Sequence, residues 1–420
     1  MAIALFLLKG GFHMEVVLLG GDLNAYSVAV SFHQAFGVRS TVFCRYRCGI
    51  TGYSSLIDLR IEKDLLDDAV GTRVLLEFAR GKKEQPYLIP CGDWYVAFLS
   101  RNRDSLAQAY RFHIPSKEIF QRVSDKAEFY AMLQKENIPY PETAILTSSD
   151  LSLSAFLSVG EYPIVLKPSQ SVCYYEHPFP NMEKVYFPKN PKEAMDTAEK
   201  IFSSGYNKKI ILQKRIGTED APPISKTLTL LSDHNGYVRR GVLGEVLVEE
   251  REKGARGNYA AILTRPPDAL TCRLLTFVEK MGYTGISNFD ILSHNGKQYV
   301  LELNPRQGRS CDYLRVAGIS LARFIVDAIE KKKIATDLSS RIGLWHAVPF
   351  GVVYNNVAKS YRNALISLRK KGRAFSAFGY KGERKTIVRC AYCKIHALRR
   401  TLALRSRKVK KDEKRKKKGN

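Results

Sequence analysis

The sequence contains no run of the roughly 18 to 20 apolar residues that a membrane-spanning helix requires. Its opening, MAIALFLLKGGFH, has a short apolar core, but no basic residue precedes it and no small-residue cleavage site follows it, which disfavours a signal peptide. Met14 then begins MEVVLLGG, which predicts a buried strand, so residues 1–13 are either a frayed extension or an artefact of the translation start. We therefore expect a cytoplasmic protein.

Cysteine usage indicates neither a disulfide framework nor a zinc site. The eight cysteines are scattered through a long chain, and we expect them to be reduced, as cytosolic thiols are. Cys390, Cys393 and His396 have the spacing of metal ligands. A structural zinc ion usually takes four ligands, and no second pair lies nearby, so zinc is disfavoured.

The common phosphate-binding motifs are also missing. The chain has no G-x-G-x-x-G turn after its first strand, no G-x-x-x-x-G-K-[ST] loop and no protein-kinase motif set. A dinucleotide is therefore not implied, and the common phosphate-binding loops are excluded. Any nucleotide site must be built from residues that are far apart in the sequence.

Charge is what the sequence has in excess, and it is unevenly placed. The formal net charge is +26 over 420 residues. Residues 381–420 hold 17 Lys and Arg against 3 Asp and Glu, so this tail supplies 17 − 3 = +14. Such runs are usually solvated. The alternative is that the tail binds an anionic surface, either the cytoplasmic leaflet of a membrane or a nucleic acid.

The chain is expected to be globular, because 45% of its 420 residues are hydrophobic and 10% aromatic. Strand, helix and strand alternate from residue 15 to about 44, which predicts an α/β layer with a parallel sheet. Gly20, Gly21, Asp22 and Asn24 follow the first strand, at the edge where such sheets bind ligands. We divide the chain into an N-terminal domain (14–120), a central domain (121–335) and a basic C-terminal extension, partly helical or disordered (336–420).

Polar residues interrupt two apolar strands of the central domain. Residues 287–304, SNFDILSHNGKQYVLELN, predict a hairpin that turns at Asn295-Gly296. Asp290 lies on its first strand, and Glu302 and Asn304 on its second. We predict an odd-numbered loop, because a two-residue loop would put Asp290 and Glu302 on opposite faces. The three side chains would then form an oxygen-lined patch suited to Mg²⁺.

Several segments together resemble the ATP-grasp superfamily, and within it the D-aspartate ligase-like carboxylate–amine ligases. The resemblance covers about residues 14–330, in the order SDK, YPIVLKPS, ILQKRIG, GNYAAILT, NFDIL and LELNPRQGRS. It implies an N-terminal parallel-sheet domain and a two-lobed α+β ATP-grasp domain. It also implies ATP and Mg²⁺ as cofactors, with Mn²⁺ as an alternative metal.

The resemblance also implies roles for individual residues. Lys126 and Lys167 would contact the phosphates of ATP. Gln213 would contact adenine through its side chain, Lys214 and Ile216 through their backbone, and Asp220 is the better candidate for the ribose. Asp290, Glu302 and Asn304 would be the metal ligands. Arg306, Arg309 and Ser310 would neutralise the transferring phosphoryl group or orient the substrate carboxylate.

Two departures from the family pattern concern the nucleotide. The segment expected to fold over the phosphates, SQSVCYYEHPFPNMEK, contains no glycine, and Gln213 stands where many relatives have an acidic residue. The geometry of this phosphate loop is therefore open.

The function that we expect is ATP-dependent activation of a carboxylate, D-aspartate or another amino acid, and its joining to an amine. A cell-wall precursor such as peptidoglycan as the acceptor would suit an enzyme held at the inner membrane surface by its basic tail. The alternatives are a ligase that makes a dipeptide or a modified metabolite, and a non-catalytic nucleic-acid-binding protein that acts through the tail. The oligomeric state stays open, a dimer included.

Overall fold

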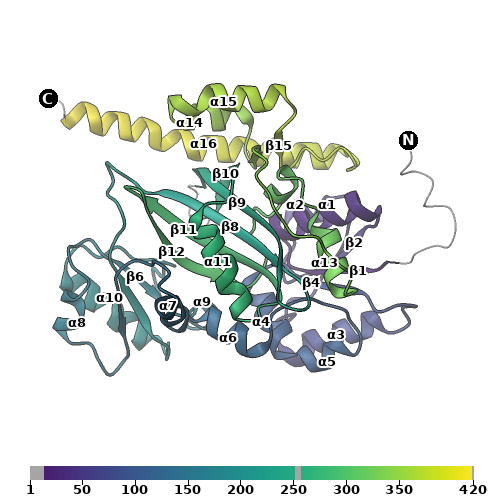
Figure 1. Ribbon diagram of the computed structural model, residues 1–420, viewed down its shortest axis with the longest axis horizontal. Coiled ribbons are helices and arrows are strands. Elements are labelled where there is room, and N and C mark those ends of the chain that lie inside the picture. Colours follow the sequence, from purple (N-terminus) through teal and green to yellow (C-terminus); the bar gives the residue numbers. More distant parts are fainter. Residues whose placement is uncertain (1–13, 251–256, 419–420) are drawn as a thin grey trace.

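The structure is a computed structural model, and it describes residues 14–250 and 257–418. Within these ranges the chain forms three sheets flanked by helices (Figure 1). Residues 1–13, for which the sequence predicted a frayed extension or an artefact, lie outside the described residues. No helix in the described ranges is long and apolar enough to span a bilayer.

The N-terminal sheet is parallel, as predicted, with strand order β3-β2-β1-β4. Its strands are β1 (Val16–Leu19), β2 (Ser40–Cys44), β3 (Ile57–Ile61) and β4 (Tyr87–Pro90). The crossover helices form where the chain supplies a cap. Asp22 accepts a hydrogen bond from the backbone N–H of Asn24 to start α1 (Leu23–Phe36), and Asp67 caps α3 (Asp68–Ala79) in the same way. The shorter helices of this region are α2 (Gly49–Gly52), α4 (Asp93–Arg101), α5 (Arg103–Ala107) and α6 (Lys117–Ser124).

A small antiparallel sheet follows, with strand order β5-β7-β6. Its strands are β5 (Thr143–Leu146), β6 (Val165–Pro168) and β7 (Ile210–Gln213). Helix α7 (Lys126–Lys135) begins after Asp125, whose side chain accepts from the N–H groups of Ala127 and Glu128. Helices α8 (Leu153–Leu157), α9 (Ser171–Tyr175) and α10 (Pro191–Ser203) belong to the same lobe and help to bury its own apolar core.

The large sheet has the order β12-β11-β8-β9-β10-β14-β15, with β13 (Asp337–Leu338) beside β9. Its other strands are β8 (Ile224–Ser232), β9 (Val238–Glu249), β10 (Tyr259–Arg265), β11 (Gly285–His294), β12 (Lys297–Asn304), β14 (Leu344–His346) and β15 (Ala374–Ser376). Helices α11 (Ala269–Lys280), α12 (Tyr313–Val316) and α13 (Leu321–Ile329) also belong to this part of the chain. The mixed α/β class and the helical C-terminal end agree with the prediction. The domain boundaries at 120 and 335 stay a proposal.

The C-terminal region consists of α14 (Phe350–Asn356), α15 (Lys359–Lys370) and the long α16 (Ile387–Lys418). Figure 1 shows α16 along one outer edge of the molecule, beside α14 and α15. Buried residues of α14, α15 and α16 share one apolar core with β9, β10 and β14. The region therefore packs onto the large sheet rather than standing apart from it.

Candidate active site

The predicted oxygen-lined patch forms on the β11–β12 hairpin. Asp290 lies directly opposite Glu302 in the antiparallel ladder. Asn304 donates from Nδ2 to Asp290 Oδ2 over 3.2 Å, and the hydroxyl of Tyr259 on β10 donates to Asp290 Oδ1 over 2.8 Å. The three candidate metal ligands are thus brought together on one face.

The route to this arrangement differs from the prediction. The hairpin turns through two residues, Asn295 and Gly296, both with positive φ (48° and 75°), and not through an odd-numbered loop. The parity is corrected further along, where the pairing shifts from Ile291–Val300 to Asp290–Glu302. Leu301 is the extra residue of this β-bulge, which rotates Glu302 onto the face of Asp290.

Three lysines surround the carboxylates. Lys126, at the start of α7, places Nζ 3.1 Å from Glu302 Oε2. Lys167, on β6, is 7% exposed and donates to the hydroxyl of Tyr130 over 3.0 Å. Lys184, from the predicted phosphate loop, lies 3.9 Å from Glu302 Oε1. Lys126 and Lys167 were predicted from the sequence, but Lys184 was not, because Lys184 lies in a loop without regular hydrophobic spacing.

Burial and mutual repulsion shift the pKa values of these groups. Burial raises the pKa of Asp290 to about 7, and the neighbouring Glu302 carboxylate adds to the effect. Burial acts on Glu302 in the same direction, but Lys126, Lys184 and Lys167 hold its pKa well below the usual range. Desolvation lowers the pKa of Lys167 to about 8. A divalent cation would relieve the carboxylate repulsion, so the donor set of Asp290, Glu302 and Asn304 fits Mg²⁺.

The two predicted arginines bridge to the N-terminal sheet. Arg306 forms two hydrogen bonds with Asp93, at the start of α4. Its Nε donates to Oδ1 over 2.6 Å, and its Nη2 donates to Oδ2 over 2.8 Å. Arg309 lies 3.4 Å from Asp22, which follows β1, and donates to Glu250 over 3.0 Å. Both aspartates lie at the carboxyl ends of parallel strands, where ligands of such sheets bind.

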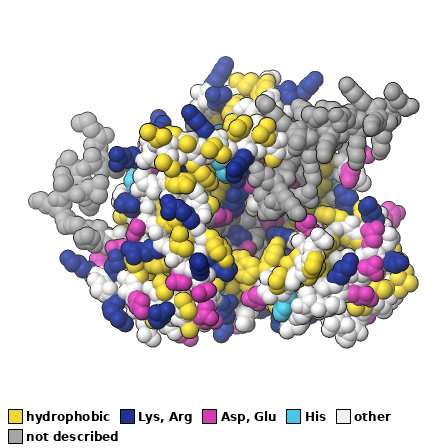
Figure 2. All heavy atoms as spheres, turned by 180° about the vertical axis from the view of Figure 1, so that it is seen from behind, with side chains coloured by type: hydrophobic (Ala, Val, Ile, Leu, Met, Phe, Trp, Pro, Cys, Tyr) yellow, Lys and Arg dark blue, Asp and Glu magenta, His cyan; other side chains and the backbone are white. Residues whose placement is uncertain are grey.

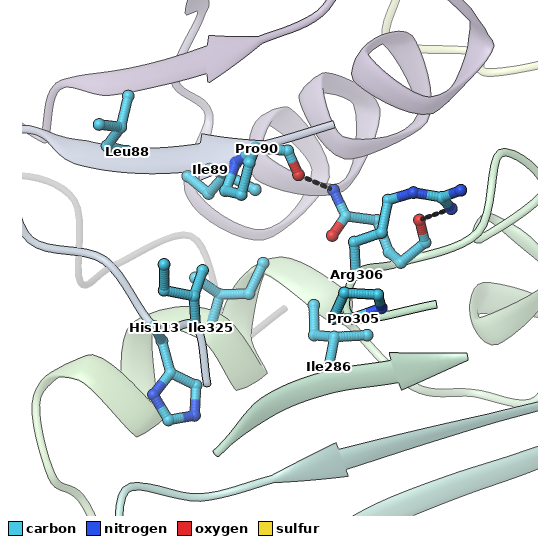
Figure 3. Close-up of a pocket in the computed structure, with 10 residues that line it drawn as sticks. Leu88, Ile89, Pro90, His113, Ile286, Pro305, Arg306 and Ile325 are labelled. Atoms are coloured by element: carbon cyan, nitrogen blue, oxygen red, sulfur yellow. Dashed lines mark hydrogen bonds between the residues drawn. The ribbon is translucent and has the colours of Figure 1, made fainter. Parts of the chain in front are cut away.

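The chain around the arginines is held against β4. Gln307 donates from Nε2 to the carbonyl of Pro90 over 3.0 Å, and Arg306 donates to the carbonyl of Gln307 (Figure 3). Ser310 is buried in the same segment. These bonds fix the backbone from which both guanidinium groups project.

The predicted adenine contacts lie at and after the end of β7. Gln213 is buried and donates from Nε2 to the hydroxyl of Thr143, which leaves its carbonyl as the acceptor. The backbone N–H of Lys214 donates to the carbonyl of Glu142, so Lys214 offers a ligand its own carbonyl. Ile216 follows in the same segment, and Asp220 is exposed in the loop before β8.

Asp22, Asp93 and Glu250 were not predicted as partners of the arginines. A signal existed for two of them. Asp22 and Asp93 each follow a buried strand of the parallel sheet by a few residues, which is the expected place for site residues. Glu250 offered no comparable pattern, because its role depends on contacts between elements far apart in sequence.

Cys390, Cys393 and His396 are not arranged as metal ligands, and within the described ranges no group of three or more His, Cys, Asp or Glu side chains is placed to hold a metal ion. All eight cysteines are free thiols. The ring of His396 packs against Phe378 and Tyr392.

With two lobes after a parallel-sheet domain and a carboxylate pair facing lysines, the chain has the fold of ATP-grasp enzymes and resembles their carboxylate–amine ligases. Among known proteins, the chain is 28% identical over 348 residues to a D-aspartate ligase from Enterococcus faecium, a match that covers 79% of this chain and 82% of the relative. No family model matches the sequence.

Solved structures agree on the fold. The biotin carboxylase domain of 2-oxoglutarate carboxylase from Hydrogenobacter thermophilus, solved with MgADP, superposes with a TM-score of 0.60 at 14% identity, covering 79% of this chain and 73% of that one. N5-carboxyaminoimidazole ribonucleotide synthetase from Thermus thermophilus gives 0.55 at 15% identity, covering 78% and 81%. The L-amino acid ligase from Bacillus licheniformis gives 0.52 at 13% identity, covering 76% and 74%.

Proposed function

We propose that this enzyme uses ATP and Mg²⁺ to activate the carboxylate of an amino acid, D-aspartate in the first instance, and to join it to an amine. The observation that carries the proposal is the partly buried Asp290–Glu302 pair, which faces Lys126, Lys167 and Lys184. The resemblance to a D-aspartate ligase supports the choice of substrate.

The geometry supports the proposed cofactor sites. Asp290, Glu302 and Asn304 would hold Mg²⁺, or Mn²⁺, which supplies charge neutralisation for the phosphates when bound. Lys126 and Lys167 would contact the phosphates, and Lys184 would join them from the phosphate loop. Gln213, Lys214 and Ile216 would hold the adenine ring, and Asp220 the ribose.

The reaction has two steps. An oxygen of the substrate carboxylate attacks the γ-phosphorus of ATP, the bond to the bridging oxygen breaks, and ADP and an acyl phosphate form. The neutral amine then attacks the acyl carbon, loses a proton and expels inorganic phosphate. The chain contributes mainly by positioning its charges, because phosphoryl transfer needs little covalent help.

The arginines would act on the substrate side. Arg306 contacts both Asn304 and Asp93, and Arg309 contacts Asp22, so both arginines would orient the carboxylate or stabilise the transferring phosphoryl group. Ser310 and the backbone N–H groups around Gly308 would stabilise the oxyanion of the second step. Asp22 and Asp93, already paired with the arginines, would attract the amino group of an amino-acid substrate.

A second candidate is a ligase that joins two amino acids or modifies a metabolite, and the fold shared with an L-amino acid ligase supports it. A nucleic-acid-binding protein without activity explains the basic tail but gives no reason for two partly buried carboxylates beside three lysines. For the first candidate we propose a cell-wall precursor as the amine and peripheral association with an anionic membrane surface.

The test is release of ADP across a panel of carboxylates and amines, with hydroxylamine present in parallel to trap the acyl phosphate as a hydroxamate. We expect ADP and hydroxamate with D-aspartate, and none with Glu302→Gln. The matched control is Glu77→Gln, a side chain on α3 that is 54% exposed and whose loss should change nothing. If no pair of substrates stimulates ADP release, or if Glu302→Gln is as active as the wild type, the assignment fails.

A further inference from the structure

Helix α16 has a buried face that anchors it to the rest of the chain. Arg389, Arg400 and Leu404 are 3%, 6% and 2% exposed. Arg389 donates to the carbonyl of Ile50 over 2.7 Å, and Arg400 lies 2.8 Å from Glu250. The ring of Tyr392 lies so close to Gly49 that a side chain there would collide with it. This face is therefore fixed.

The opposite face of α16 is apolar and exposed. Val388, Ile395, Leu398 and Leu402 are 54%, 52%, 59% and 55% exposed. At about 100° per residue these positions fall on one stripe, which lies roughly opposite the buried face. Large apolar side chains lined up on a surface in this way indicate an interaction site rather than chance exposure.

Positive charge accompanies the stripe. On the helical wheel the exposed Lys394 and Arg399 lie on either side of it. Beyond Leu404, residues 405–418 hold 10 Lys and Arg against 2 Asp and Glu, a net of 10 − 2 = +8. The space-filling view shows hydrophobic and basic side chains next to one another over the upper part of the molecule (Figure 2).

We propose that the outer face of α16 docks on the surface of an anionic lipid bilayer. An apolar stripe flanked by cations suits a helix that lies in the plane of the headgroups, with its apolar side chains below them and its basic side chains among them. A second copy of the chain would bring like charges together along both sides of the stripe, so the observations favour lipid over self-association.

Docking would place the site close to the membrane. Glu250 binds Arg400 of α16 through Oε1, and the same oxygen accepts from Arg309 of the candidate active site. The docking face thus lies about one helix diameter, roughly 10–12 Å, from the residues that bind Arg309. This rests on the proposed function and deepens its membrane association, because an amine acceptor attached to a lipid would then lie within reach of the site.

The test is sedimentation of the full chain with vesicles of phosphatidylcholine alone and of equal parts phosphatidylcholine and phosphatidylglycerol. The critical variant is Leu398→Gln/Leu402→Gln. Its matched control is Leu153→Gln/Leu157→Gln on α8, a pair with the same spacing and with 54% and 56% exposure. A third variant ends at Leu404, which removes the basic run and keeps the buried anchors.

We expect the wild type and the α8 control to bind the anionic vesicles and not the neutral ones. The α16 double variant should bind them about 30-fold more weakly, because two leucines no longer enter the apolar layer. The truncated chain should also lose binding, and high salt should weaken that of the wild type. Unchanged binding of the α16 double variant would overturn the proposal, as would a change in its oligomeric state with vesicle binding intact.

ADP release without vesicles separates this result from the proposed function. Leu398 and Leu402 lie on the exposed face of α16, opposite the buried residues that face the site, so soluble activity of the double variant should equal that of the wild type. Loss of vesicle binding with retained activity supports docking by α16. If the wild type binds vesicles through α16 but has no ligase activity, the proposed function is refuted and the docking surface is still supported.

Discussion

Helix α16 should be coupled to the active site through a single carboxylate, and a double-mutant cycle can measure the coupling. Glu250 and Arg400 have side chains that are 4% and 6% exposed, with 2.8 Å between them. In Arg400→Ala, Glu250 keeps Arg309 but loses one charge-assisted contact, which we expect to cost about 2 kcal/mol of the free energy that holds the helix in place. This corresponds to roughly 30-fold more frequent opening.

Hydrogen exchange of the α16 amides between residues 389 and 404 reports that opening. Arg400→Ala should raise their exchange about 30-fold in the wild-type background, but only about threefold in Glu250→Gln, where the charge is already gone. Arg399→Ala, on the exposed side of the helix, is the control and should change little. Equal effects of Arg400→Ala in both backgrounds would refute the coupling.

Three further outcomes are expected. Asp290→Asn should need a higher Mg²⁺ concentration for ADP release and, at saturating Mg²⁺, should lose at least about tenfold in rate, whereas an unchanged Mg²⁺ dependence would exclude it as a ligand. Lys184→Ala should raise the KM for ATP about fivefold without lowering the melting temperature, since this lysine is 57% exposed, and an unchanged KM would remove it from the site. Burial, with Arg400 next in effect, lowers the pKa of His396 to about 4. The folded chain therefore favours the neutral ring, and stability is lost as the pH falls from about 6.5 toward 4. The melting temperature of His396→Phe should fall less steeply over that pH range than that of the wild type. Parallel curves for the two proteins would show that His396 does not cause the loss of stability.

The sequence predicted the order of the elements well, because each depends on local signals. Asp125 caps α7, and such a cap is a local feature, since an aspartate before a helical run needs only the N–H groups of the next turn. The parallel N-terminal sheet likewise followed from short buried strands that alternate with helices. These features need no knowledge of distant contacts.

The pairing register of the β11–β12 hairpin could not be predicted from local signals. The convergence of Asp290 and Glu302 was predicted, but from an odd loop, whereas the structure combines a two-residue turn with a bulge at Leu301. Counting along a strand cannot detect a bulge, because one extra residue changes the face of everything beyond it. The shared face of Asp290 and Glu302 was predicted more reliably from the chemistry of their side chains than from counting residues along the strands.

Contacts between distant segments were beyond prediction. Arg309 and Arg400 lie on either side of Glu250, and the three come from β12–α12, α16 and the end of β9. No periodicity links those positions. The tail was predicted from its charge alone, so the buried face of α16 was missed.

The buried Lys167 has a consequence for chemical labelling. With a pKa of about 8, it carries an uncharged amine in about half of the molecules at pH 8, whereas an ordinary lysine does so in fewer than about 1%. A small amine-directed reagent that can reach the site should therefore modify Lys167 ahead of the many exposed lysines. A bound nucleotide should protect Lys167 from the reagent. The yield of the modified Lys167 peptide, measured by mass spectrometry, would then report how much of the site is occupied by nucleotide.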